Sequence, residues 1–200
     1  MTKGMFCKTK KPIHYKDDYL EILRRVSAGM LHHGNILCFD YAIKNLPSDN
    51  PIIEIGTFCG LSTNVISYFK KIHSKQNIII SMDKYNLSEK NGTVGKSDIT
   101  YQDYRTYVRE SLVKNISLFS KGDLPLIFEK TSDDFFNQWA NDNIECDIFK
   151  REFILGGKIS FAYIDGNHSY EYVKRDFLNC DKYLENGGFI LFDDSADFSD

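Results

Sequence analysis

Three acidic residues and a histidine follow two short apolar runs in the second half of the chain. Asp165 ends the first run and His168 stands three residues later, whereas Asp193 and Asp194 end the second run. Adjacent carboxylates repel each other unless they are solvated or share a cation. Together with Asp165 they would form an oxygen-only cluster, which suits a hard divalent ion such as Mg²⁺. We therefore predict a metal site at Asp165, Asp193 and Asp194; the plainer alternative is a solvated acidic loop.

His168 is the candidate for moving a proton, because the pKa of an imidazole lies close to neutrality. It stands in the segment Asp165-Gly-Asn-His168-Ser, and either Asn167 or Ser169 is suited to begin the helix that follows. Two structural alternatives stay open at this point. Asp165 would then serve only in a turn or cap, and His168 would be an ordinary hydrogen-bonded loop histidine.

A second group of residues points to a nucleoside-type ligand. The segment from Glu54 to Ser62 holds Gly56 and Gly60, and Asp83 follows 23 residues after Gly60. Glycines at a strand-to-helix turn allow close backbone approach, and an acid about 20 residues further on can accept hydrogen bonds from ribose hydroxyls. The segment is not G-x-G-x-x-G, because it has only two glycines. The alternatives are a glycine-containing turn and an exposed turn aspartate.

The elements that would position these residues alternate between strands and helices, which predicts an α/β fold with a mainly parallel sheet. Three of the five expected strands end on an acidic residue, at the sheet edge where such folds bind ligands. Residues 84–100 are expected to form a loop, which is either a lid over the site or a disordered surface insertion. Strands are expected at 51–55, 77–82, 124–130, 159–164 and 189–192, and helices at 15–30, 36–46, 61–72, 104–119, 133–150 and 170–184, the last ended by Gly187 and Gly188.

Composition limits the classes of protein to consider. The chain has 200 residues and a net charge of −3, which fits one ordinary globular domain and gives no basic excess for nucleic acid. No apolar run approaches the roughly 18 residues of a membrane span, and no secretory signal is evident. Five cysteines without a C-x-x-C pair argue against a disulfide or cysteine–zinc framework. We therefore expect a cytoplasmic protein.

The order of the motifs resembles that of class I S-adenosylmethionine-dependent methyltransferases. The motifs are E-I-G-x-x-x-G-x-S, an acid-ended second strand, I-D-G-N-H-S-Y and G-G-F-I-L-F-D-D, over about residues 50 to 195. They look most like the macrocin and mycinamicin sugar O-methyltransferase group, and more distantly like catechol-type metal-dependent enzymes. The resemblance implies a Rossmann-like three-layer sandwich with strand order 3-2-1-4-5. It also implies an N-terminal helical segment (1–48) packed on a cofactor-binding domain (49–200), with the family's final strand pair missing.

The resemblance also implies individual roles. Asp83 would hold the ribose hydroxyls of S-adenosylmethionine, and Ser132 would approach its adenine. Asp165, Asp193 and Asp194 match the metal-binding acids of the family. His168 matches a general base of some members, and Asp165 would join it in catalysis. The residues that would line the methionine part of the cofactor are Glu54, Gly56, Thr57, Phe58, Gly60 and Ser62.

The function implied is transfer of a methyl group to a hydroxyl of a small molecule, such as a sugar or a natural product, with Mg²⁺ as the metal. A hydroxyl is a poor nucleophile until its proton leaves, which is the reason for a cation and a base beside it. Two alternatives remain: a nicotinamide-dependent oxidoreductase, disfavoured by the missing third glycine, and an inactive cofactor-binding module, favoured by the early end of the chain. A homodimer would cover the open sheet edge.

Overall fold

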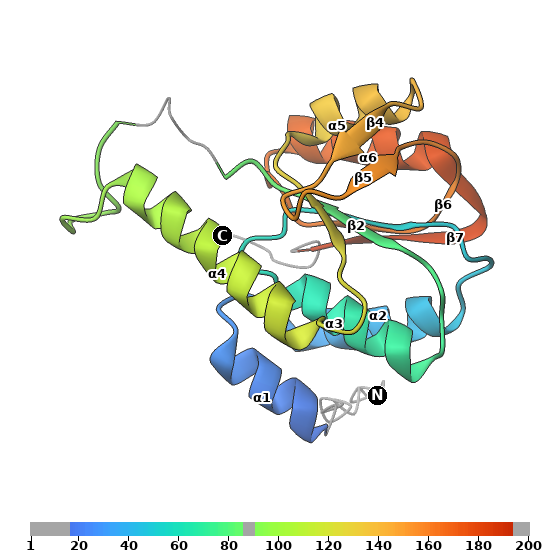
Figure 1. Cartoon of the computed structure of the whole chain (residues 1–200), viewed down its shortest axis with the longest axis horizontal. Coiled ribbons are helices and arrows are strands. Elements are labelled where there is room, and N and C mark those ends of the chain that lie inside the picture. The colour runs from blue at the N-terminus through green and yellow to red at the C-terminus, as the bar shows by residue number, and fades with distance from the viewer. Residues whose placement is uncertain (1–16, 86–90, 194–200) are drawn as a thin grey trace, which may run out of the picture.

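A parallel sheet lies between two layers of helices in the computed structural model, which describes residues 17–85 and 91–193 (Figure 1). Helices α2, α3 and α4 cover one face of the sheet, and α5 and α6 cover the other. The helices are α1 (Asp18–Val26), α2 (His33–Lys44), α3 (Leu61–Ile72), α4 (Tyr101–Phe119), α5 (Ser132–Trp139) and α6 (Tyr170–Tyr183). The strands are β1 (Ile52–Ile55), β2 (Ile79–Met82), β3 (Leu126–Phe128), β4 (Ile144–Cys146), β5 (Glu152–Ile154), β6 (Ile159–Ile164) and β7 (Leu184–Phe192).

The five-stranded sheet has the order β3-β2-β1-β6-β7, and all of its neighbouring pairs are parallel. Since β6 and β7 are its fourth and fifth strands along the chain, the predicted order 3-2-1-4-5 and the three-layer architecture are confirmed. The central strand β1 pairs Ile53 with Ile80 of β2 and with Ala162 of β6. Every residue of β1, β2 and β6 is buried, as expected for strands with helices on both faces. Their carboxyl ends meet at one edge.

The predicted helix at 133–150 is wrong in its second half. Helix α5 ends at Trp139, and β4 and β5 form an antiparallel hairpin. The hairpin turn is held by the buried carboxylate of Asp147, which accepts hydrogen bonds from the amides of Phe149 and Arg151 at 2.9 Å. The Arg151 guanidinium also donates to Asp147 and to the carbonyl of Leu124. This long-range clamp determines the local structure, and the sequence pattern gave no sign of it.

The start of the last strand also differs from the prediction. Helix α6 ends at Tyr183, so Gly187 and Gly188 do not end it; they lie inside β7. Gly187 has φ +84°, and a Cβ on Gly188 would lie 2.8 Å from the carbonyl oxygen of Ser160 in β6. The register between β6 and β7 is irregular there. The glycines therefore allow β7 to begin five residues earlier than the expected start at 189.

The first two helices pack on the layer formed by α3. Leu20 and Leu23 of α1 and Phe39 of α2 are buried in one cluster with Val65 of α3. Asp17 caps α1 by accepting from the amide of Leu20, and it also accepts from the hydroxyl of Tyr68 in α3. The described part of the N-terminal segment thus contacts α3. The boundary at residue 48 stays a prediction.

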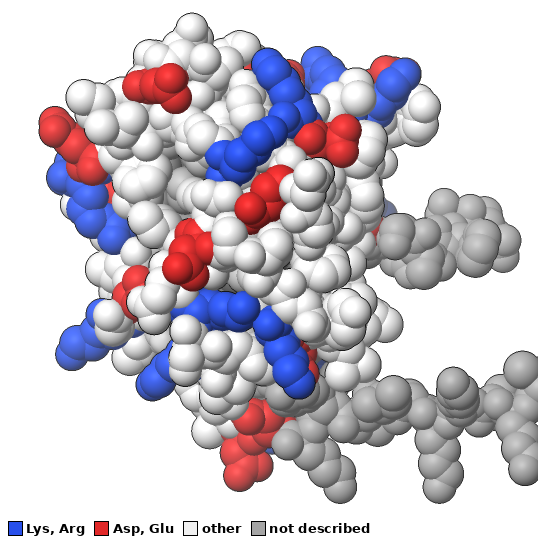
Figure 2. Space-filling model, turned by 90° about the vertical axis from the view of Figure 1, so that its right-hand side faces the viewer, with Lys and Arg blue, Asp and Glu red and all other residues white. Residues whose placement is uncertain are grey.

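Two surface features bear on the expected partners. None of the helices in the described ranges is long and apolar enough to cross a membrane. Acidic and basic side chains are interspersed on the face seen in Figure 2, without a continuous basic band.

Substitutions at three glycines test how closely Gly56, just after β1, packs against the backbone of Asp165. A Cβ on Gly56 (φ +89°) would lie 1.9 Å from the carbonyl oxygen of Asp165, whereas Gly157 (φ +84°) and Gly122 have no atom within 4 Å of that position. We expect Gly56→Ala to lower the free energy of unfolding by about 3 kcal/mol or more, through collision and backbone strain. Gly157→Ala should cost about 1–2 kcal/mol from strain alone, and Gly122→Ala close to nothing. Urea unfolding measures all three, and equal losses at Gly56 and Gly157 would contradict the close contact.

Candidate functional site

The loop between β1 and α3 is tied to the end of β2 by Asp83. Oδ2 of Asp83 accepts hydrogen bonds from the backbone amides of Thr57 at 3.1 Å and Phe58 at 2.9 Å. The amide of Gly60 donates to the carbonyl of Thr57 at 2.7 Å, and Gly60 enters α3 with φ +83°. Burial raises the pKa of Asp83, and its backbone hydrogen bonds and the charge of Arg105 oppose that shift. The glycine loop therefore has a fixed path beside an acidic residue.

Glu54 lies beneath this loop and is fully buried. Its Oε1 accepts from the hydroxyl of Ser62 at 2.5 Å, and its Oε2 accepts from Thr63 at 2.5 Å and Ser81 at 2.6 Å. Burial raises the pKa of Glu54, and the three hydroxyl groups lower it in part. Both Glu54 and Ser62 were predicted to line the cofactor. In the structure, their side chains bond to each other at the start of α3.

Tyr85 contacts the same loop and was not predicted to do so. Its hydroxyl forms hydrogen bonds with the side chain of Thr57 and with the carbonyl of Phe58 at 3.2 Å, and its ring is buried beside Val108 and Ile127. The expected 84–100 loop therefore begins on a core residue, and its segment 86–90 lies outside the described residues. The signal that sequence reasoning missed is an aromatic residue two positions after the strand-ending acid.

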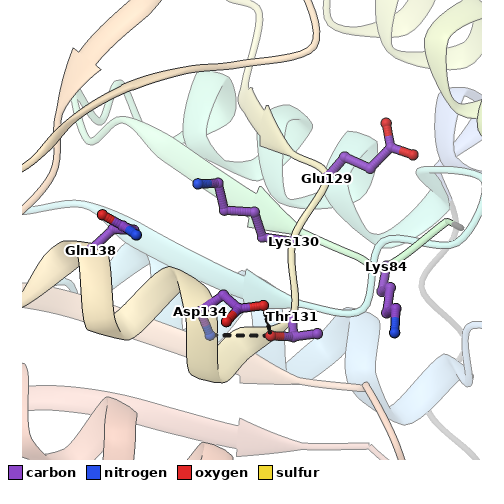
Figure 3. A pocket seen from close by; sticks show the side chains of 6 residues that line it. All are labelled: Lys84, Glu129, Lys130, Thr131, Asp134 and Gln138. Atoms are coloured by element: carbon purple, nitrogen blue, oxygen red, sulfur yellow. Dashed lines mark hydrogen bonds between the residues drawn. The ribbon is translucent and has the colours of Figure 1, made fainter.

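A cleft of about 370 Å³ opens at the carboxyl ends of β2 and β3, and its lining includes Lys84, which follows Asp83 in the chain (Figure 3). Figure 3 shows Lys84 from the end of β2 beside the start of α5, where Thr131 bonds to Asp134. Ser132, predicted to approach an adenine, adjoins this cleft, but its hydroxyl donates to Asp176 of α6 at 2.5 Å. The residues that line the cleft are Lys84, Glu129, Lys130, Thr131, Asp134 and Gln138.

The predicted metal ligands Asp165 and Asp193 lie together at the ends of β6 and β7. Oδ2 of Asp165 accepts from the hydroxyl of Tyr163 at 3.2 Å, and Oδ1 of Asp193 accepts from the side-chain amide of Asn35. Burial, and after it the charge of the neighbouring Asp193 and a hydrogen bond with it, together raise the pKa of Asp165 to about 8. Asp194 lies outside the described residues. Within those residues, no group of three or more candidate ligands is arranged to hold a metal.

The candidate base His168 adjoins this carboxylate pair. Its Nε2 lies 3.4 Å from Oδ1 of Asp165, and its side chain is 56% exposed. The structure thus brings His168 and Asp165 together, and their catalytic roles stay predictions. Sequence reasoning did not find Asn35 or Tyr163, which hold the pair.

The chain belongs to a methyltransferase family. The family profile described as "Methyltransferase domain" matches residues 53–195, which include both the glycine loop and the acidic cluster. The predicted class of protein is therefore confirmed. A curated relative, an uncharacterized protein of Acanthamoeba polyphaga mimivirus, is 26% identical over 150 residues, which is 75% of this chain and 53% of that protein.

Solved structures share the fold at low identity. The calicheamicin methyltransferase has a TM-score of 0.52 and 16% identity, covering 82% of this chain and 65% of its own. The O-methyltransferase from Bacillus cereus, solved in complex with SAH, has a TM-score of 0.55 and 15% identity, covering 86% and 63%. The chain thus spans about half the length of the curated relative and less than two thirds of these two structures.

The buried Glu54 carboxylate generates a prediction about stability and pH. Glu54→Ala should lower the free energy of unfolding by about 3 kcal/mol or more, because three buried hydroxyls lose their acceptor. Since burial raises the pKa of folded Glu54 above its ordinary 4.5, the folded chain keeps this proton to higher pH than the unfolded chain. The stability of the native chain relative to Glu54→Gln should therefore fall as pH rises above about 4.5. Denaturant titrations at several pH values measure the difference in the free energy of unfolding between the native chain and Glu54→Gln. A difference that grows in favour of the native chain as pH rises would contradict the burial of Glu54.

Proposed function

We propose that this protein is an S-adenosylmethionine-dependent O-methyltransferase that methylates a hydroxyl group of a small molecule. One observation carries the proposal. In a chain of the methyltransferase family, the glycine loop tied to Asp83 and the carboxylate pair Asp165–Asp193 lie at the same edge of the sheet. The first suits the adenosyl and methionine parts of a cofactor, and the second suits activation of a hydroxyl.

The residues on the cofactor side fit this ligand. Asp83 would accept from ribose hydroxyls, and the cleft lined by Lys84 and Thr131 would offer room for a base. The backbone of residues 56–60 would contact the methionine part, with Thr57 and Phe58 held by Asp83. Glu54 and Ser62 would support this loop from below. S-adenosylmethionine, when bound, supplies a methyl group on a positively charged sulfur.

The acidic side fits a divalent cation, which we propose to be Mg²⁺. Among residues 17–85 and 91–193, the ion pair that reaches these two carboxylates is the one between His168 and Asp165. Asp165 and Asp193 would hold the cation with Asp194, and the cation would supply positive charge beside the acceptor oxygen. His168 would take the hydroxyl proton on Nε2, and Asp165 would stabilise the imidazolium.

The acceptor proposed is a sugar or natural-product hydroxyl. The fold shared with the calicheamicin methyltransferase supports this choice, as does the resemblance to macrocin-type enzymes. The net charge of −3 and the mixed charges of Figure 2 speak against nucleic acid as the substrate. We also propose a cytoplasmic location and a homodimer that covers β7, one of the two outer strands of the described sheet. The family match favours methyl transfer over the nicotinamide alternative.

Removing Asp83 tests the cofactor side. Calorimetric titration of Asp83→Ala with S-adenosylhomocysteine should show affinity reduced about 10-fold or more, because the ribose acceptor and the loop tether are both lost. Asp83→Asn retains a carbonyl oxygen for the loop amides, so its affinity should lie between those of the native chain and Asp83→Ala. Asp181→Ala, at an exposed position of α6, is the matched control and should leave the affinity unchanged. Equal affinity in Asp83→Ala would remove Asp83 from the binding site.

Removing a charge at Asp165 tests the acidic side separately. Asp165→Asn should bind S-adenosylhomocysteine normally but lose about 100-fold or more of its Mg²⁺-dependent methyl transfer. The measurement follows labelled methyl groups from S-adenosylmethionine into a panel of hydroxylated sugars and phenols, with EDTA-treated native protein as control. Transfer that survives both EDTA and Asp165→Asn would show that no cation acts at this site.

A further inference from the structure

The N-terminal helix α2 reaches the carboxylate pair through a residue that lies outside the family match. Asn35 stands in the first turn of α2, 18 residues before residue 53, where the match begins. Its Nδ2 donates to Oδ1 of Asp193, across 158 positions of the chain, and lies 3.4 Å from the hydroxyl of Tyr163. The same amide therefore contacts a predicted metal ligand and the phenol that bonds to Asp165.

Packing of α2 fixes the position of this amide. Phe39, one turn after Asn35, is fully buried and meets the ring of Tyr163 edge-on at a centroid distance of 4.8 Å. Ile36 and Ile43 anchor the same helix in the core beside α3. This packing fixes the backbone of Asn35 beside Asp193.

The chemistry of the contact suits a support for cation ligands. Two carboxylates at adjoining strand ends repel each other, and a hydrogen bond from a neutral group holds one of them without cancelling its charge. Asn35 does this for Asp193, and Tyr163 does it for Asp165. A lysine or arginine in place of Asn35 would instead neutralise the charge that a cation needs. Residues that orient metal ligands in this way commonly change metal affinity 10- to 100-fold when they are removed.

We propose that Asn35 is a positioning residue of the cation site, holding Asp193 beside Asp165, so that α2 forms one wall of the active site. This inference rests on the metal site of the proposed function. It extends the site beyond the residues of the family match. It also assigns a functional reason for the packing of the N-terminal helices on the core.

Mn²⁺ binding to the full chain, followed by the electron paramagnetic resonance signal of the free ion, tests the proposal. Asn35→Ala should weaken Mn²⁺ affinity about 10- to 100-fold, while affinity for S-adenosylhomocysteine, measured in parallel, changes less than about twofold. The matched control is Asn45→Ala at the other end of α2, where the side-chain amide donates only to the carbonyl of Tyr41 in its own helix. Both affinities should be unchanged in this control.

A second variant keeps the test decisive if Asn35→Ala does not fold. Asn35→Asp has nearly the same size but adds a third carboxylate beside Asp193. Its melting temperature without metal should fall below that of the native chain, and its rise on adding Mn²⁺ should exceed the native rise, because the cation relieves the added repulsion. An Mn²⁺-induced rise no larger than the native one would overturn the proposal.

The outcomes separate this inference from the proposed function. Native protein that binds Mn²⁺ and an Asn35→Ala variant that binds it equally well would overturn the role of Asn35 alone. Native protein that binds S-adenosylhomocysteine but no Mn²⁺ would overturn the metal site and, with it, this role. Weakened Mn²⁺ binding with unchanged S-adenosylhomocysteine binding supports both.

Discussion

The buried carboxylate of Glu54 is the interaction on which the geometry of the glycine loop depends. A carboxylate without access to water is costly unless hydrogen bonds replace its hydration. Three hydroxyls do so here, and they come from the neighbouring strand β2 and the first residues of α3. This carboxylate therefore joins β1 to β2 and to the start of α3, the helix that follows the glycine loop. With those ends fixed, the loop has little freedom, and Asp83 completes its anchoring through the amides of Thr57 and Phe58.

The two halves of the site are held by different kinds of contact. The cofactor side is organised by hydrogen bonds around the β1–α3 turn and the end of β2, close to the family's glycine motif. The acidic side depends on side chains from distant parts of the chain, with Asn35 and Tyr163 holding Asp193 and Asp165. Under the proposed function, binding of the cofactor and activation of a hydroxyl would therefore rest on separate sets of residues.

Much of the fold was predictable because its signals are local. The apolar runs of β1, β2 and β6 and the acids after them follow directly from burial on both faces and from a common ligand edge. The β4–β5 hairpin was not predictable, since its short strands have exposed side chains and its turn depends on Asp147 and Arg151 bonding back toward β3. Asn35 was missed for the same reason. An asparagine near a helix start has many roles, and only the folded chain places it against Asp193.

Equilibrium dialysis of the native protein against labelled S-adenosylmethionine decides whether this chain uses that cofactor. We expect one molecule bound per chain with affinity in the micromolar range, displaced by S-adenosylhomocysteine and unaffected by NAD⁺ or NADH. A folded sample that binds no S-adenosylmethionine, or that releases it to a nicotinamide nucleotide, would show that it does not.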